Sequence, residues 1–165
     1  MIAKTAIIDP MAKLADDVKV GEYTVIGADV EIGPGTEIAS HVVLHGPMKI
    51  GKGNRIFPFA FLGCEPQDLS YTGEVSRVEI GDNNVIREYV TIHRGTNKQD
   101  CVTKIGNDNL IMGYVHIAHD CCVGNHCILA NAVQMAGHVV MEDYSALGGM
   151  VAVHQFVRIG RYCFV

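Results

Sequence analysis

The sequence predicts an all-β fold, a parallel β-helix in which the chain winds around an aliphatic core in six-residue repeats. Three observations predict this fold: an aliphatic residue at every sixth position, small residues directly after those positions, and only two interruptions of the pattern. A period of six fits neither the period of about 3.6 of an α-helix nor the simple alternation of an ordinary strand. Because a solenoid repeats one structural unit, we expect residues 1–165 to form a single elongated domain.

The aliphatic ladder accounts for most of the chain. Eleven successive positions in steps of six are aliphatic: Ile2, Ile8, Leu14, Val20, Ile26, Ile32, Ile38, Leu44, Ile50, Ile56 and Leu62. The same phase returns at Ile80, Ile86 and Ile92, then shifts by one residue and runs in steps of six from Ile105 to Val165. These 25 repeats predict about eight coils of 18 residues, each coil being one turn of three strands around a triangular prism.

Small residues follow the ladder positions. Ten of the 18 glycines do so: Gly21, Gly27, Gly33, Gly51, Gly63, Gly81, Gly106, Gly124, Gly148 and Gly160. A small residue at this place lets the backbone turn a corner without a clash, so each repeat predicts a short strand followed by a corner. Neighbouring parallel strands lie about 4.8 Å apart, so eight coils predict a prism roughly 40 Å long.

Two segments interrupt the ladder. Between Leu62 and Ile80 the sixfold positions hold Asp68 and Glu74, and the segment before Ile105 has one extra residue and the composition of a loop. We expect excursion loops near residues 64–78 and 94–104. Loops on a rigid scaffold often carry function, and tolerated insertions are the plain alternative. Val165 is itself a ladder position, which leaves the last coil without a polar cap, so we expect the natural chain to continue.

Composition excludes several classes of protein. The net charge of −5 and the pI near 5.8 argue against a general nucleic-acid binder, which needs a basic surface. No apolar run approaches the ~20 residues of a membrane-spanning helix, and the first residues, MIAKTAIIDP, lack the pattern of an export signal. We therefore expect a cytoplasmic protein whose six cysteines are reduced thiols.

Histidines gather in space once the coils are stacked. Residues 18 apart lie one above the other, which places Gly137 next to His119 and His138 next to Asp120. His116 is a further neighbour of His119 on the same edge of the prism. His119 stands two places after an aliphatic residue, so its side chain is predicted to face outward rather than into the core.

This cluster favours acyl-transfer chemistry. A histidine outside the core can act as a general base, and the N–H of a neighbouring glycine can hold a developing oxyanion. No serine or cysteine nucleophile accompanies them, which favours direct transfer: His119 takes a proton from an acceptor hydroxyl, which attacks a thioester. The plain alternative is a set of solvated histidines on a solenoid that binds something else.

A metal site is a second alternative. His116 and His119 with a third histidine could hold zinc, as three histidines do between the subunits of a trimeric β-helical zinc enzyme of the carbonic anhydrase type. The cysteines do not have the paired spacing of a zinc finger, and we predict no metal and no cofactor.

Several longer segments resemble one family closely. They are PQDLSYTGE (66–74), RVEIGDNNVIRE (77–88), TIHRGT (91–96), DNLIM (108–112), HIAHD (116–120), CILAN (127–131), AGHV (136–139) and GGMVAVHQF (148–156). These segments are similar to the hexapeptide-repeat acyltransferases, and in particular to the acyl-[acyl-carrier-protein]–UDP-N-acetylglucosamine O-acyltransferase family. The resemblance runs over the whole chain.

The resemblance implies a fold, an activity and partners. The fold is a left-handed β-helix, which in the family assembles as a cytoplasmic homotrimer and continues into a C-terminal helical domain. The activity moves a 3-hydroxyacyl chain from acyl carrier protein to the 3-hydroxyl of UDP-N-acetylglucosamine, the first step of lipid A biosynthesis. A related enzyme with an amino-sugar acceptor is the alternative within the family.

The resemblance also implies roles for individual residues. His119 is the general base, Asp120 orients it, and Gly137 holds the oxyanion. The residues matching positions that line the substrate cleft are Asp68, His93, His116, His138, His154 and Gln155. Ser70 departs from the pattern, because many relatives have a substrate-contacting lysine there. The candidate basic residues for docking an acidic carrier protein are Lys52, Arg55, Arg87, Arg94, Lys98 and Lys104.

Overall fold

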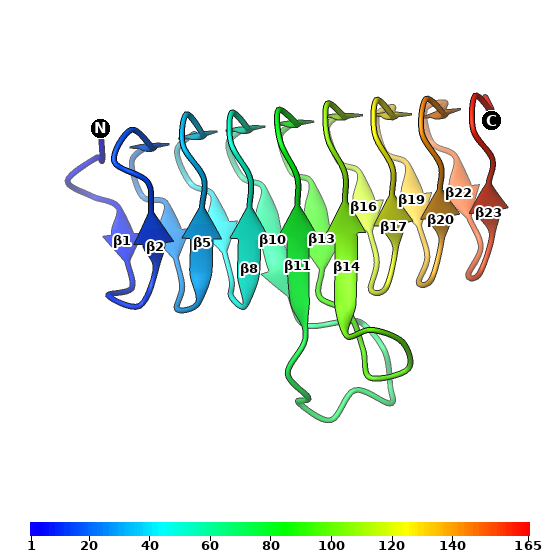
Figure 1. The fold of residues 1–165 in the computed structure, drawn as a ribbon, viewed down its shortest axis with the longest axis horizontal. Helices are drawn as coiled ribbons and strands as arrows, with labels where there is room; N and C mark the ends of the chain where they lie inside the picture. Colours follow the sequence, from blue (N-terminus) through cyan, green and yellow to red (C-terminus); the bar gives the residue numbers. More distant parts are fainter.

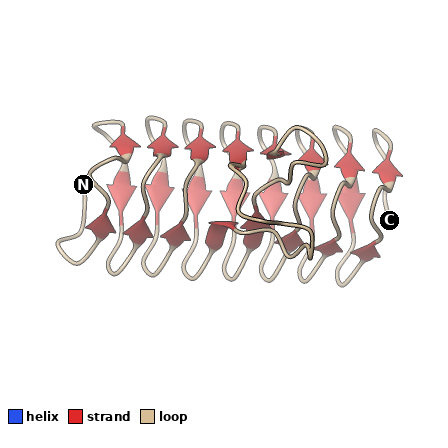
Figure 2. Cartoon of the chain, turned by 90° about the horizontal axis from the view of Figure 1, so that it is seen from below, coloured by secondary structure: helices blue, strands red, loops and turns tan.

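The computed structural model describes all 165 residues as one triangular prism built only from short strands (Figures 1 and 2). Its 23 strands form three parallel sheets, and the two ends of the chain lie at opposite ends of the prism. The chain winds around the prism axis in a left-handed sense (Figure 1). None of its elements is a helix able to cross a membrane. The predicted all-β, left-handed parallel β-helix is confirmed.

Each sheet takes one strand from each coil and is named here after its first strand. The β1 sheet contains β1 (Ile7–Ile8), β4 (Val25–Ile26), β7 (Val43–Leu44), β10 (Phe61–Cys64), β13 (Thr91–His93), β16 (His116–Ile117), β19 (Gln134–Met135) and β22 (Ala152–Val153). The β2 sheet contains β2 (Lys13–Leu14), β5 (Val30–Ile32), β8 (Met48–Ile50), β11 (Arg77–Ile80), β14 (Val102–Ile105), β17 (Cys122–Val123), β20 (Val140–Met141) and β23 (Arg158–Ile159). The β3 sheet contains β3 (Lys19–Val20), β6 (Glu37–Ile38), β9 (Arg55–Ile56), β12 (Val85–Ile86), β15 (Leu110–Ile111), β18 (Ile128–Leu129) and β21 (Ala146–Leu147).

The sixfold aliphatic residues form the core. Leu62, Ile92 and Ile117 of successive coils in the β1 sheet are paired in register and fully buried. Only the ends of the ladder are open, where Ile2 and Val165 are about half exposed because no further coil covers them. The ladder therefore supplies one continuous core along the axis, and burial of its apolar area stabilises the stacked coils.

The left-handed backbone conformation and the small residues fall at different places in the corners. Most residues with positive φ stand three places after a ladder position, as at Asp120 (φ 60°) and His138 (φ 63°), and Gly63 (φ 84°) is the one glycine directly after a ladder position that has this conformation. The other glycines at this place are needed for space instead: a Cβ on Gly21 would lie 2.6 Å from the backbone of Ala39 in the next coil. Close approach of successive coils, rather than a left-handed backbone, explains the small residues at this place.

The two interruptions of the ladder are loops on the same edge of the prism. The first loop, residues 65–76, joins β10 to β11, and the second loop, residues 94–101, joins β13 to β14. Both leave the β1 sheet where it turns into the β2 sheet, and both hang below the prism in Figure 1. This corner row is called the loop edge below. Lys98 of the second loop pairs with Asp68 of the first at 2.7 Å, so the loops support each other.

Candidate active site

The loop edge carries the histidine cluster. His119 and Asp120 form the corner between β16 and β17, and Gly137 and His138 form the same corner one coil later. A Cβ on residue 137 would lie 2.5 Å from Cε1 and 2.7 Å from Nε2 of His119. The predicted stacking of His119 against Gly137 is therefore correct, and only glycine leaves room for the imidazole in this position.

His119 lies outside the aliphatic core, as predicted, but it does not face solvent. Its residue exposure is only 5%, and that of Asp120 is 3%. The first loop covers the site because it brings Asp68 Oδ2 to 3.7 Å from His119 Nε2. The repeat predicted that the side chain at this corner points away from the core. It could not predict the burial of His119, because the loop residues that cover it lie outside the six-residue repeat.

His119 and Asp120 form a hydrogen-bonded pair. Nδ1 of His119 lies 2.8 Å from Oδ2 of Asp120. A carboxylate only accepts hydrogen bonds, so the imidazole donates from Nδ1, and in the neutral ring the lone pair is then on Nε2. This is the arrangement in which a neutral histidine accepts a proton at Nε2 while the adjacent carboxylate stabilises the resulting cation.

A groove in front of His119 has a volume of about 520 Å³. Its lining includes Gln67 and His116, the pair His119 and Gly137, and His154 with Gln155 from the following coil. The Gly137 N–H has no protein acceptor. An imidazole Nε2 and an unpaired amide N–H thus border one open space, as a proton acceptor and an anion-binding donor.

Asp68 belongs to the first loop and contacts both His119 and the second loop. It accepts hydrogen bonds from Lys98 Nζ at 2.7 Å and from the backbone and side chain of Ser70. These hydrogen bonds, with Lys98 contributing most, hold the pKa of the Asp68 carboxyl well below its usual range. Ser70 therefore orients Asp68, while the cationic group beside Asp68 comes from Lys98 of the second loop.

His93 and His116 are two further histidines near His119. Their rings meet edge to face at 4.8 Å, and His116 Nδ1 is hydrogen-bonded to Thr91 Oγ1 at 2.7 Å. Burial, with smaller effects of His116 and His119, lowers the pKa of His93 to about 4. Burial also lowers the pKa of His116. His93 Nδ1 is buried without a protein partner, so His93 is held in its neutral form.

Replacing His93 with glutamine is expected to weaken the acid sensitivity of the fold. Between the pKa of about 4 in the folded state and about 6.5 in the unfolded chain, the unfolded chain binds more protons, so stability falls as the pH falls. His93 alone accounts for a loss of about 3 kcal/mol across this window. The measurement is urea unfolding at about pH 7 and about pH 4.5. An equal loss of stability in both proteins would contradict this assignment.

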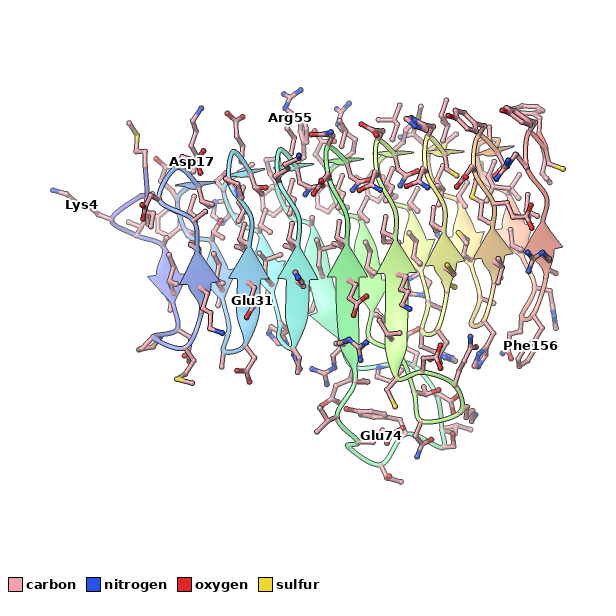
Figure 3. The ribbon with its side chains drawn as sticks, in the orientation of Figure 1. Lys4, Asp17, Glu31, Arg55, Glu74 and Phe156 are labelled. Atoms are coloured by element: carbon pink, nitrogen blue, oxygen red, sulfur yellow. The ribbon has the colours of Figure 1, made fainter.

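The remaining predicted residues lie around the same groove. His138 stacks on Phe156 at 4.5 Å, and its Nδ1 lies 3.1 Å from Oε1 of Gln99 in the second loop. Burial lowers the pKa of His138. His154 and Gln155 are exposed and line the groove. Figure 3 shows Phe156 at the lower edge of the prism, on the side from which the loop residue Glu74 projects.

The structure therefore brings all nine predicted site residues to one edge, and adds others that the repeat could not indicate. Thr96 and Thr103 hydrogen-bond Asp120, Lys98 pairs with Asp68, and Gln99 contacts His138. Three of these four residues belong to the second loop, whose interruption of the ladder was the only available signal.

The candidate basic residues do not form one cluster. Arg55 and Arg87 lie against the ring of Phe57, whereas Arg94 and Lys98 belong to the loop edge. Lys52 lies 3.9 Å from Asp82, and Lys104 is an exposed residue of β14. These six candidates for docking an acidic carrier protein therefore lie in separate places on the prism.

His119, Asp120 and His138 place three potential metal-ligand atoms within 4.8 Å of one another. This set differs from the predicted one, because His116 is bonded to Thr91. The Asp120 oxygens accept hydrogen bonds from Thr96 and His119. The donor set is thus arranged as a hydrogen-bonded acid–imidazole pair rather than as ligands directed at a common ion.

Comparison with known proteins agrees with this arrangement. The family model "Bacterial transferase hexapeptide (six repeats)" matches residues 11–46 and 103–137. An acyl-[acyl-carrier-protein]–UDP-N-acetylglucosamine O-acyltransferase of Stutzerimonas stutzeri is 56% identical over 99% of this chain and 64% of its own length. The protein of the same name from Saccharophagus degradans is 59% identical over 79% of this chain and 50% of its own length.

Solved structures show the same similarity. The UDP-N-acetylglucosamine acyltransferase of Francisella novicida superimposes with a TM-score of 0.98 at 49% identity, covering 99% of this chain and 60% of that protein. The corresponding enzyme of Bacteroides fragilis superimposes with a TM-score of 0.97 at 44% identity, over 99% of this chain and 64% of that protein. The chain thus spans about half to two thirds of the length of the relatives it matches.

Proposed function

Because this chain belongs to the acyl-[acyl-carrier-protein]–UDP-N-acetylglucosamine O-acyltransferase family of hexapeptide-repeat proteins, we propose that it catalyses direct transfer of an acyl chain from a carrier-protein thioester to that sugar nucleotide. The observation that carries the proposal is the groove bordered by His119 Nε2 and the unpaired N–H of Gly137. The acyl group is a 3-hydroxyacyl chain and the acceptor is the 3-hydroxyl of UDP-N-acetylglucosamine, as in the first step of lipid A biosynthesis.

The reaction begins with deprotonation of the acceptor. His119 Nε2 takes the proton from the sugar hydroxyl as its oxygen attacks the thioester carbonyl carbon, and a C–O bond forms. Asp120, hydrogen-bonded to Nδ1 at 2.8 Å, stabilises the imidazolium produced. The general base is expected to contribute about 10²- to 10⁴-fold to the rate.

The second half of the reaction releases the carrier. The N–H of Gly137 donates a hydrogen bond to the oxyanion of the tetrahedral intermediate. As the intermediate collapses, the C–S bond breaks and the imidazolium of His119 returns its proton to the departing thiolate. The products are the acylated sugar nucleotide and the carrier-protein thiol, and no further reactant is consumed.

The remaining residues of the groove are proposed to hold the substrates. His154 and Gln155 are exposed in its wall, and Asp68, whose Oδ2 lies 3.7 Å from His119 Nε2, is proposed to accept hydrogen bonds from sugar hydroxyl groups. His116 also lines the groove, and His93 and His138 support the wall through their contacts with His116 and His119. Three copies of the chain are proposed to associate in the cytoplasm, so that a neighbouring copy closes each groove.

The test is a transfer assay with the purified chain. A 3-hydroxyacyl carrier protein is mixed with UDP-N-acetylglucosamine or with its 3-amino analogue, and the acylated product is measured by mass spectrometry. The proposal expects product from the hydroxyl acceptor and a much smaller yield from the amine. Preferential acylation of the amine would replace the proposed acceptor, and bound zinc with no transfer to either acceptor would contradict the proposed reaction.

A further inference from the structure

Thr96 of the second loop contacts the carboxylate of Asp120 more extensively than any other residue. Its backbone N–H lies 2.9 Å from Oδ1 and 3.1 Å from Oδ2 of Asp120, and its Oγ1 lies 2.6 Å from Oδ2. Both residues are buried, so these hydrogen bonds form away from water. In such a setting a hydrogen bond to a charged group is stronger than one at the surface.

The orientation of Asp120 is determined from two sides. Its backbone N–H donates to Thr103 Oγ1 at 2.9 Å, while Thr96 donates to its side-chain oxygens. The same Oδ2 accepts the hydrogen bond from His119 Nδ1 at 2.8 Å. Any rotation of the carboxylate toward His138, whose Nε2 lies 3.8 Å from Oδ2, would break the contacts with Thr96.

The backbone of the second loop is shaped for this contact. A Cβ on Gly95 would lie 2.2 Å from the backbone nitrogen of Val102 and 2.8 Å from Oδ1 of Asp120. Glycine at this position therefore lets the loop approach the carboxylate closely. The single backbone N–H of Thr96 is then shared between both oxygens of Asp120, and its hydroxyl donates to Oδ2. Further along the loop, Gln99 contacts His138, and Lys98 contacts Asp68.

We propose that Thr96 is a positioning residue for the reaction: it holds Asp120 in the orientation that keeps the proton of His119 on Nδ1 and the lone pair of Nε2 toward the groove. This inference rests on the proposed acyl transfer. Thr96 does not line the groove, so its contribution passes through Asp120 and His119. Its removal is expected to slow the chemical step and to leave substrate binding nearly unchanged.

The test compares three variants of the 165-residue chain. Thr96→Val removes the hydroxyl while keeping the shape and the backbone N–H, Thr96→Ser restores a hydroxyl, and Thr72→Val makes the same change at an exposed threonine of the first loop. For Thr96→Val we expect kcat to fall about 10- to 100-fold with KM changed less than about twofold. Thr96→Ser is expected to recover most of the rate, and Thr72→Val to retain it.

A spectroscopic measurement supports the kinetic one. The downfield proton NMR signal of the His119 Nδ1–H, assigned by its disappearance in His119→Ala, is expected to shift or broaden in Thr96→Val and to return in Thr96→Ser. Circular dichroism shows whether each variant is folded. A folded Thr96→Val protein with unchanged kcat and an unchanged Nδ1–H signal would overturn the inference. If the unaltered chain transferred no acyl group, the proposed function would fail, and the NMR signal would still decide whether Thr96 positions the pair.

Discussion

Replacement of His119 with alanine is expected to lower the rate of acyl transfer by about 10²- to 10⁴-fold, because the reaction loses its proton acceptor. His116 and His138 do not replace it, since their Nδ1 atoms are bonded to Thr91 and Gln99 and neither forms the carboxylate-supported pair that His119 forms with Asp120. The loss is expected in kcat, because the groove and the substrate-binding side chains remain. The measurement is the initial rate of product formation at saturating concentrations of both substrates.

His126 provides the matched control for this experiment. It stands at a corner between the β2 and β3 sheets, where its ring stacks on Tyr144 at 4.8 Å, away from the loop edge. His126→Ala is expected to keep the transfer rate of the unaltered chain. Undiminished transfer by a folded His119→Ala protein would exclude His119 as the base. Equal losses in both variants would mean that the effect arises from general destabilisation.

Replacement of Leu129 with alanine is expected to cost about 2–5 kcal/mol of the free energy of unfolding. Leu129 is a ladder residue of β18 and is fully buried between coils, so truncating it leaves a cavity in a core that extends along the whole prism. Each coil contacts only the coils on either side of it. The neighbouring ladder side chains are held in register by their own strands, so they fill that cavity poorly. Urea unfolding followed by circular dichroism measures the change.

The adjacent residue of the same strand supplies the comparison. Ile128 is aliphatic too, but its side chain points outward and the residue is 43% exposed. Ile128→Ala is expected to cost less than about 1 kcal/mol, because little apolar area is withdrawn from contact. Similar losses for Leu129→Ala and Ile128→Ala would contradict the assignment of the sixfold positions to the core.

Most of the fold could be predicted from the sequence because a solenoid translates one unit along an axis. The step of six placed Ile117, Leu129 and the other ladder residues in the core, and the step of 18 placed Gly137 against His119. The position of His119, the proposed general base, against the amide of Gly137 could therefore be predicted by counting along the chain. The handedness of the winding came from family resemblance, since parallel crossovers in other folds are usually right-handed.

That small residues after the ladder positions avoid a clash could be predicted from the sequence, but the partner in that clash could not. The left-handed backbone falls mostly at residues such as Asp120 and His138, where the corner bends. Gly21 and Gly137 are glycines because a neighbouring coil leaves no room for a Cβ. Distances between coils depend on the packed prism and are not visible in the order of residues along the chain.

The all-β solenoid, its aliphatic core and the edge on which the histidines gather could be predicted from residue order, because each follows from a fixed period. The burial of His119, the pairing of Lys98 with Asp68 beside it, and the contact of Thr96 with Asp120 are visible only in the folded chain. These contacts come from the two loops, which interrupt the period and carry no spacing rule. Their side chains reach the site only because the winding of the prism brings both loops to the same edge.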